Sequence, residues 1–223
     1  MRTVLAAILL AWALSGPPVS RAEPETCPPQ CDRIPATAWP GPRALPSDPA
    51  DRWPALADVA VPVTAPRFGF EDLCATPPVA DARTFAVAAR AVVGRPDGSR
   101  QLQGRIVHWR GETWRGGDLA NGVFGAAVDA LRACRTGPAR LTTAAPDRVA
   151  AVLDGPVPAR VYLLVDPRSS TISELLFTRA VALPAWPTVP DARILDAMSA
   201  PLCAAFLTCA APAVAQSAPT TAT

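Results

Sequence analysis

Six cysteines that follow an apolar N-terminal leader constrain this chain more than any other feature. The leader predicts export to an oxidising compartment, where disulfides form and persist. An even number of cysteines in an exported chain is typical of a fold braced by disulfides, here three. The six residues are Cys27, Cys31, Cys74, Cys134, Cys203 and Cys209.

Residues 1–22 have the pattern of a secretory signal peptide. Arg2 gives a positive start, residues 4–14 are an unbroken apolar run, and the small residues Ser20 and Ala22 precede a cleavage site. The run is too short to span a bilayer, and no lipobox precedes Cys27. We therefore expect a secreted or cell-envelope protein with no stable membrane insertion after cleavage.

Two pairings of the cysteines fit their spacing. In one, the first two and the last two cysteines close short loops, and Cys74 pairs at long range with Cys134. In the other, the first two cysteines bond to the last two and fix the N-terminal segment to the last helix. A redox role is not favoured, because the C-x-x-x-C spacing of Cys27 and Cys31 lies in an extended segment and not at the start of a helix.

The charged residues exclude several classes of function. All 21 basic residues are arginine, so the chain can contain neither a Walker A phosphate loop nor a Schiff-base lysine. Removal of Arg2 and Arg21 leaves 19 arginines against 19 acids, and a neutral chain is not generally attracted to nucleic acid. His108 is the single histidine, which limits any metal site. The sequence predicts no metal, no cofactor and no nucleic-acid partner.

Residues 23–83 contain 13 prolines, too many for long helices or central strands. Their large apolar side chains are costly to expose, at roughly 1.5–3 kcal/mol each. We predict an extended strap that lies across the domain and is held by these side chains and by disulfides, with a disordered linker as the alternative. The side chains are Trp39, Trp53, Phe68, Phe70 and Leu73.

Residues 84–209 predict one disulfide-braced domain. We expect a hairpin whose two strands flank the turn cluster 94–98. A helix is expected after the capping residue Asp118. Three more strands and a last helix are expected after it. Pro201 requires a kink in the last helix or a new start at Ser199. The predicted ranges are 84–93, 100–110, 119–135, 147–154, 159–166, 171–178 and a helix from about Asp191.

The predicted order ββ-α-βββ-α places no helix between successive parallel strands. It favours an α+β fold, an antiparallel sheet of about five strands with helices on one face. Residues 210–223 are of low complexity and predict a disordered tail.

The segment 108–117 is the most site-like stretch, because a strand ends there in a glycine-rich loop. Tryptophan faces can stack on sugar rings, and arginines can fork onto carboxylate or phosphate groups. The alternative is that Trp109 packs in the core and the arginines cover apolar surface. The candidate binding residues are His108, Trp109, Arg110, Trp114 and Arg115.

A catalytic interpretation of His108 needs a nearby serine and an orienting carboxylate. The chain has no Gly-x-Ser-x-Gly elbow, and strand alternation places His108 on the face of Leu102 and Ile106. A structural histidine is favoured, and no catalytic residue is assigned. The available partners are Ser99, Ser169, Ser170, Ser173, Asp118 and Asp166.

Two further segments have structural interpretations. Residues 166–170 (DPRSS) resemble a reverse turn, because proline takes the second position and Asp166 can bond the local backbone. Glu174 is the only acid in its predicted strand, and we expect it to face water.

Several segments together resemble a family of small secreted proteins of unknown function from mycobacteria and related actinobacteria. They are CPPQCDRIP, RWPALADVAVPV, PRFGFEDLCATPP, VHWRG, ALRAC, YLLVDPRSSTISEL and LDAMSAPLC. The resemblance covers nearly the whole mature chain, implies export and assigns no activity. The order of elements is more loosely similar to extracytoplasmic sensor domains of mycobacterial kinases and lipoproteins.

These observations favour a non-catalytic envelope or secreted module that binds a ligand or a protein partner. The alternatives are a hydrolase that uses His108 with a nearby serine, and a structural surface protein without a small ligand.

Overall fold

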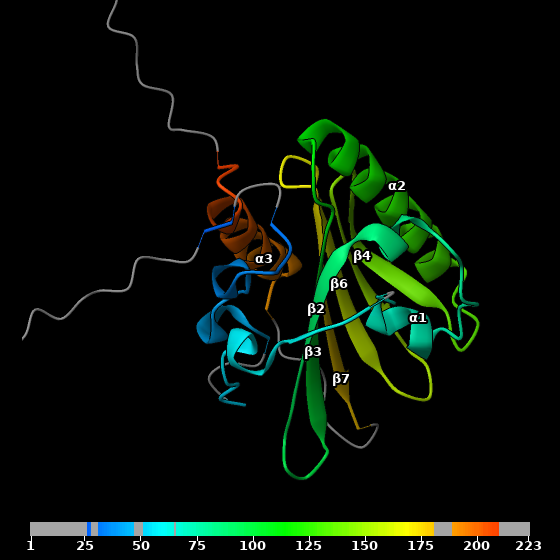
Figure 1. The fold of residues 1–223 in the computed structure, drawn as a ribbon. Coiled ribbons are helices and arrows are strands. Elements are labelled where there is room, and N and C mark those ends of the chain that lie inside the picture. Colours follow the sequence, from blue (N-terminus) through cyan, green and yellow to red (C-terminus); the bar gives the residue numbers. More distant parts are fainter. Residues whose placement is uncertain (1–25, 28–30, 47–50, 65, 181–188, 210–223) are drawn as a thin grey trace, which may run out of the picture.

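The computed structural model describes residues 26–27, 31–46, 51–64, 66–180 and 189–209. The predicted signal peptide and C-terminal tail lie outside the described residues. The described chain is an α+β fold around one seven-stranded antiparallel sheet (Figure 1). None of its described helices is long and apolar enough to cross a membrane.

The strands follow the order β1-β2-β3-β7-β6-β5-β4 across the sheet. They are β1 (Val61–Pro62), β2 (Val87–Gly94), β3 (Arg100–His108), β4 (Ala139–Ala145), β5 (Arg148–Leu153), β6 (Ala159–Asp166) and β7 (Thr171–Arg179). The helices are α1 (Gly69–Leu73), α2 (Thr113–Arg132) and α3 (Asp191–Ala205).

The sheet joins the predicted hairpin to the predicted three-stranded meander. β2 and β3 form the hairpin, and β5, β6 and β7 form the meander. The two units meet where β3 pairs with β7, with Leu102 opposite Phe177 and His108 opposite Thr171. The end of β3 is therefore fixed beside the β6–β7 turn.

The described helices cover both faces of the sheet, which corrects the prediction that they lie on one face (Figure 1). α3 packs on the face that carries Leu102, Ile106 and Phe177, and α2 packs on the opposite face. The reason is the composition of β6 and β7, which carry large apolar side chains on both faces. Strands of this kind must be buried on both sides.

The described part of the strap contributes to both cores. Trp39 and Trp53 are 6% and 5% exposed on the α3 side, and Phe68 and Phe70 are fully buried on the α2 side. The indole Nε1 of Trp53 donates to the carbonyl oxygen of Pro46 at 2.7 Å. Strap and sheet therefore share their cores in the described residues.

Two strands were not expected, so the prediction of about five is too low. β1 is only two residues long and lies in the proline-rich segment. β4 (ARLTTAA) is rich in alanine and threonine and lies at the edge of the sheet. A register shift between Leu141 and Thr143 interrupts its pairing with β5, and the hydroxyls of Thr142 and Thr143 both donate to Asp191 of α3.

The helix boundaries differ from the predicted ones in two places. α2 begins at Thr113 with Glu112 as N-cap, so Asp118 lies inside the helix instead of capping it. Pro201 lies inside α3, and no new helix begins at Ser199.

The disulfides follow the first of the two predicted pairings. Cys27 bonds to Cys31 and Cys203 bonds to Cys209, while the Cys74–Cys134 bond joins α1 to the end of α2. The long-range bond spans 60 residues of sequence, with the Cα atoms 4.6 Å apart.

Candidate functional site

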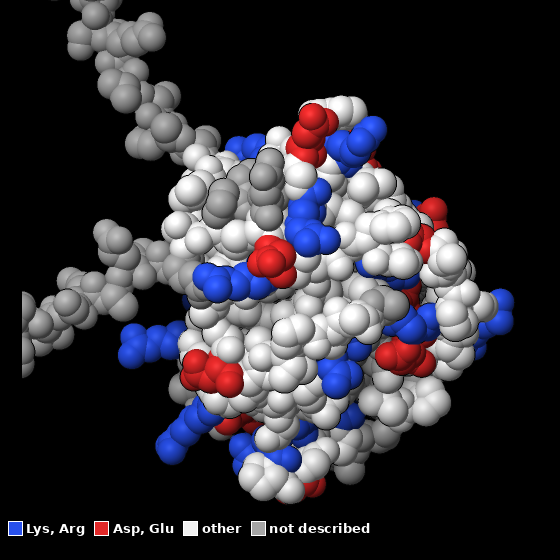
Figure 2. Space-filling model, viewed as in Figure 1, with Lys and Arg blue, Asp and Glu red and all other residues white. Residues whose placement is uncertain are grey.

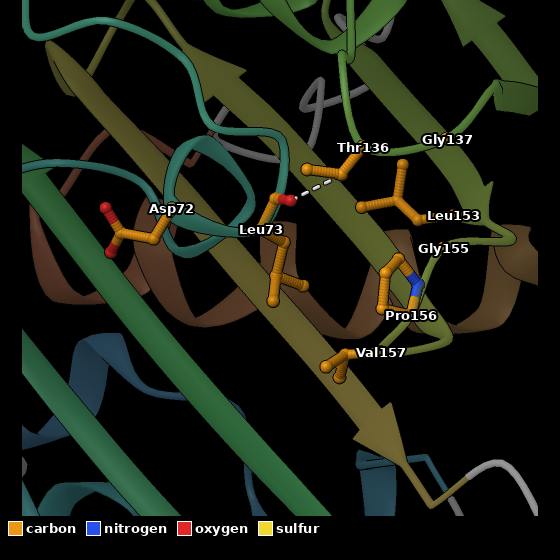
Figure 3. A pocket seen from close by; sticks show the side chains of 8 residues that line it. All are labelled: Asp72, Leu73, Thr136, Gly137, Leu153, Gly155, Pro156 and Val157. Atoms are coloured by element: carbon orange, nitrogen blue, oxygen red, sulfur yellow. Dashed lines mark hydrogen bonds between the residues drawn. The ribbon is translucent and has the colours of Figure 1, made fainter.

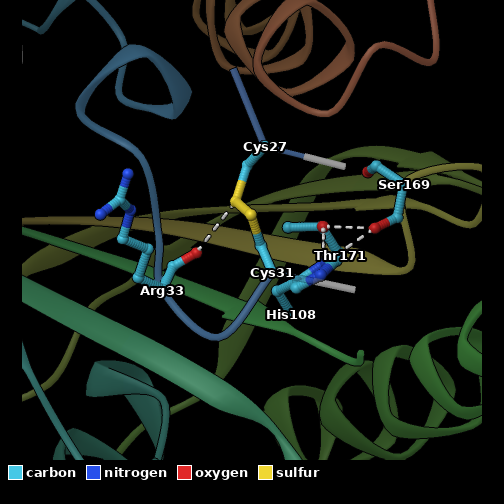
Figure 4. The surroundings of a disulfide bond; sticks show 6 residues. All are labelled: Cys27, Cys31, Arg33, His108, Ser169 and Thr171. Carbon is cyan, nitrogen blue, oxygen red and sulfur yellow. Dashed lines mark hydrogen bonds between the residues drawn. A yellow bond between two sulfur atoms is a disulfide. The ribbon is translucent and has the colours of Figure 1, made fainter. Parts of the chain in front are cut away.

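The sheet separates the five predicted binding residues. His108 is fully buried on the α3 side, where its ring stacks on Phe206 with the centroids 4.4 Å apart. Its Nδ1 lies 3.0 Å from the carbonyl oxygen of Ser169 and 3.1 Å from the hydroxyl of Thr171 (Figure 4). The face of the sheet predicted for His108 is confirmed, and its place in an accessible binding site is wrong.

Burial also argues against the hydrolase alternative. A general base must come within hydrogen-bond reach of the substrate. His108 has no exposed surface, and Ser169, Ser170 and Ser173 are each 1–2% exposed. The Cys27–Cys31 disulfide lies close to His108 and Thr171 (Figure 4), and the N–H of Cys27 donates to the carbonyl oxygen of Ala205.

Trp109 lies in the opposite core and is 2% exposed. Its indole Nε1 donates to the carbonyl oxygen of Ala82 at 2.9 Å. A buried indole with a satisfied N–H is a packing residue. The expectation that Trp109 offers a face to a ligand is therefore corrected.

The other three candidates lie at the surface around the start of α2. Trp114 is 65% exposed, and Arg110 and Arg115 are exposed as well. The guanidinium carbon of Arg115 lies 5.6 Å from the centre of the Trp114 ring, within range of a cation–π contact.

Trp114 forms one side of an open groove of about 340 Å³, called the Trp114 groove below. The opposite side is the turn between β6 and β7, which supplies Pro167 and Arg168. The side chain of Arg168 is 64% exposed. The groove is lined by Thr113, Trp114, Gly117, Asp118, Asn121, Pro167 and Arg168.

The predicted reverse turn at residues 166–170 is present, and it forms this side of the groove. Hydrogen bonds within the turn hold it in place. The Asp166 carboxylate accepts from the backbone N–H of Arg168 at 3.1 Å, and the Ser169 hydroxyl donates to the carbonyl oxygen of Asp166. The hydroxyl of Ser170 donates to the carbonyl oxygen of Thr113 at 3.1 Å and so ties the turn to α2.

Two glycines allow α2 to approach this turn. A Cβ atom on Gly116 would lie 2.5 Å from the Ser170 hydroxyl oxygen, and one on Gly117 would lie 2.6 Å from the carbonyl oxygen of Pro167. Neither separation is possible for real atoms. In the sequence this glycine pair resembles part of a loop. In the structure both glycines lie inside α2, where a larger residue would collide with the turn.

We expect Gly117→Ala to lower the free energy of unfolding by about 1–3 kcal/mol, because the Pro167 backbone must shift. The matched control is Gly122→Ala in the same helix, where a Cβ meets nothing within 4 Å. That change should stabilise the protein by up to about 1 kcal/mol through helix propensity. Urea denaturation measures both, and equal effects of the two variants would contradict the close contact.

The groove combines an aromatic ring with charged side chains of both signs. Arg168 and Asp118 line it, and Arg115 lies against the Trp114 ring. The N-cap of α2, Glu112, is acidic but gives no side-chain cap. The arrangement offers an aromatic face with cations beside it.

Sequence reasoning missed a buried charge cluster on the α2 side of the sheet. Glu174 is fully buried, so the expectation that it faces water is wrong. It accepts from the backbone N–H groups of Gly69 and Phe70 at 2.7 and 3.1 Å. Burial raises the pKa of its carboxyl, while the charge of Arg105 and these hydrogen bonds oppose that rise.

A second pocket, of about 170 Å³, lies next to the Cys74–Cys134 disulfide (Figure 3). It is lined by the end of α1 and by the loops before β4 and after β5. The hydroxyl of Thr136 is already used, because it donates to the carbonyl oxygen of Leu73. This small pocket offers fewer free polar groups than the Trp114 groove.

Within the described residues, no group of three or more histidine, cysteine, aspartate and glutamate side chains is arranged to hold a metal. No family model, curated protein or solved structure matches the chain. The resemblance to secreted actinobacterial proteins therefore stays a prediction.

Proposed function

We propose that this protein is an extracytoplasmic, non-catalytic binding module whose ligand occupies the Trp114 groove. Three disulfides support a place outside the cytoplasm, because such bonds form and persist in oxidising compartments. The burial of His108 supports a role without catalysis.

The observation that carries the proposal is the exposure of Trp114 on a rigid frame. A large aromatic side chain that stays in water lacks the roughly 1.5–3 kcal/mol of stabilisation that burial would give. Trp114 is 65% exposed, although the adjoining backbone is fixed by the Ser170 hydroxyl and by the close contact of Gly117. A side chain on a fixed backbone has less conformational freedom to lose when it binds a partner.

The chemistry of the groove indicates what such a partner presents. The indole can stack on a sugar ring or another flat apolar group. Arg115 and Arg168 can form charge-assisted hydrogen bonds with an anionic group. Asn121 and Asp118 add neutral and acidic polar atoms. An envelope glycan or a protein segment with an acidic group next to a ring fits this set.

The test is retention of the protein on purified cell-wall fractions. Replacing Trp114 and Arg115 together by alanine should abolish retention and leave the melting temperature unchanged, because substitutions at exposed positions usually change stability by less than about 0.5 kcal/mol. A matched control replaces Phe85, which is 77% exposed, and the exposed Arg193 of α3. The control should be retained like the wild type.

Unchanged retention of the Trp114 and Arg115 variant would reject the groove as the binding surface. Absence of retention in the wild type would favour the alternative of a structural surface protein.

A further inference from the structure

Two arginines lie directly opposite each other on the sheet, away from the Trp114 groove. Arg90 of β2 pairs in register with Arg105 of β3, so their side chains share the α2-side face. Like charges placed in this way destabilise a sheet. In Figure 1, β2 and β3 lie toward the viewer.

Neither arginine has an ionic partner among the described residues. Arg105 is 6% exposed, and its buried Nη1 has no hydrogen-bond partner in that part of the chain. Arg90 is exposed and forms no ion pair there. Burial lowers the pKa of Arg105, the charge of Glu174 opposes this effect, and the charge of Arg90 adds to it. A buried guanidinium without hydrogen bonds carries a desolvation cost that a native structure must offset.

The nearby acids are already engaged. Glu71 holds Arg83 through two bonds of 2.8 and 3.0 Å, and Asp72 pairs with Arg67 at 3.1 Å. Glu174 lies opposite Arg105 in the register of β3 and β7, but its oxygens accept from the N–H groups of Gly69 and Phe70.

Arg90 and Arg105 contribute two positive charges on this face, and Glu174 opposite Arg105 contributes one negative charge. Over the wider cluster the charges balance, because Glu71, Asp72 and Asp81 exceed their partners Arg83 and Arg67 by one charge. The face that Figure 2 shows carries acidic and basic side chains scattered among one another.

We propose that Arg90 and Arg105 together bind one anionic group of a ligand, a carboxylate or a phosphoryl group. The exposed side chain of Arg90 gives the route of entry, and the buried Arg105 provides the unused donors. A planar guanidinium fork matches the oxygens of both kinds of group. The bound anion separates two cations that otherwise repel each other. This site is independent of the proposed role of Trp114.

The experiment is isothermal titration calorimetry of the whole mature protein with inorganic phosphate and, separately, with acetate, at constant ionic strength. The wild type should bind at least one of them saturably at one site. Binding of phosphate alone identifies a phosphoryl site, and binding of acetate alone identifies a carboxylate site. Arg90→Gln and Arg105→Gln should each weaken this binding about tenfold or more, the effect expected from losing a charge-assisted hydrogen bond.

The matched control is Arg193→Gln on α3, which should bind the anion like the wild type. Arg90 is exposed, so Arg90→Gln decides the outcome even where Arg105→Gln does not fold. No saturable heat with either anion, or an Arg90→Gln titration equal to that of the wild type, would overturn the proposal.

Discussion

Replacing Arg83 by methionine is expected to lower the free energy of unfolding by about 3–5 kcal/mol, because it leaves buried carboxylates without their cation. The Arg83 guanidinium donates to both oxygens of Glu71 and also to Asp81, which lies 2.8 Å away in the ion pair. Burial acts to lower the pKa of Arg83, but these bonds raise it. These bonds therefore favour the charged form of the Arg83 guanidinium.

The loss extends beyond one ion pair. Glu71 is 4% exposed and accepts from the backbone N–H of Phe68, at the start of α1. The guanidinium carbon of Arg83 also lies 5.0 Å from the centre of the Phe68 ring. Without Arg83, a buried charged Glu71 remains beside an aromatic ring, and the attachment of α1 to the sheet is weakened.

Urea denaturation of Arg83→Met measures this effect, with Arg132→Met as the matched control. Arg132 pairs with Asp129 at 3.2 Å, but its side chain is 55% exposed. Exposed pairs of this kind contribute less than about 1 kcal/mol. A loss in Arg83→Met no larger than that in the control would show that the Glu71–Arg83–Asp81 cluster does not hold the strap.

Removing the Cys74–Cys134 disulfide by a double alanine substitution is expected to cost about 4 kcal/mol. The bond closes a segment of 60 residues, so its loss gives the unfolded chain much conformational freedom. The Cys203–Cys209 bond closes only six residues, and its removal should cost about 2 kcal/mol in the same chain-entropy account.

Urea denaturation without reductant compares the two double variants. Peptide mapping of the unreduced wild type checks the pairing itself and should recover three pairs within the chain. A smaller loss for the long-range bond than for the short one would contradict the role assigned to Cys74 and Cys134.

Local pattern was sufficient for the strands that alternate or are uniformly apolar. The range of β6 was predicted as observed, and those of β3, β5 and β7 differ by one or two residues at an end. Alternation also placed His108 on the side of Leu102 and Ile106. These features depend on neighbouring residues in one strand, which is the range over which a sequence pattern acts.

Features made by contacts distant in sequence could not be predicted in this way. Gly116 and Gly117 have low helix propensity, yet α2 contains both because the β6–β7 turn presses against them. Glu174 carries no sequence signal of burial, since its partners are N–H groups more than 100 residues away. The second helical layer goes with the burial of β6 and β7 on both faces, which was not predicted from the sequence.

The candidate site was only partly accessible to sequence reasoning. Two Trp-Arg pairs look alike in the segment 108–117, but Trp109 directly follows β3 and is buried, and Trp114 lies in the first turn of α2 and is exposed. Pro167 and Arg168 gave no sign of a shared groove, because only the pairing of β3 with β7 brings their turn to α2.

Nitrogen–proton correlation NMR of the mature protein, titrated with solubilised cell-wall polysaccharide, tests the binding role most directly. The largest shifts should fall on the Trp114 indole N–H and on the amides of Arg115, Asn121 and Arg168, with Phe85 and Arg193 unaffected. Shifts confined to other surfaces, or an unchanged spectrum at saturating polysaccharide, would contradict a ligand site at the Trp114 groove.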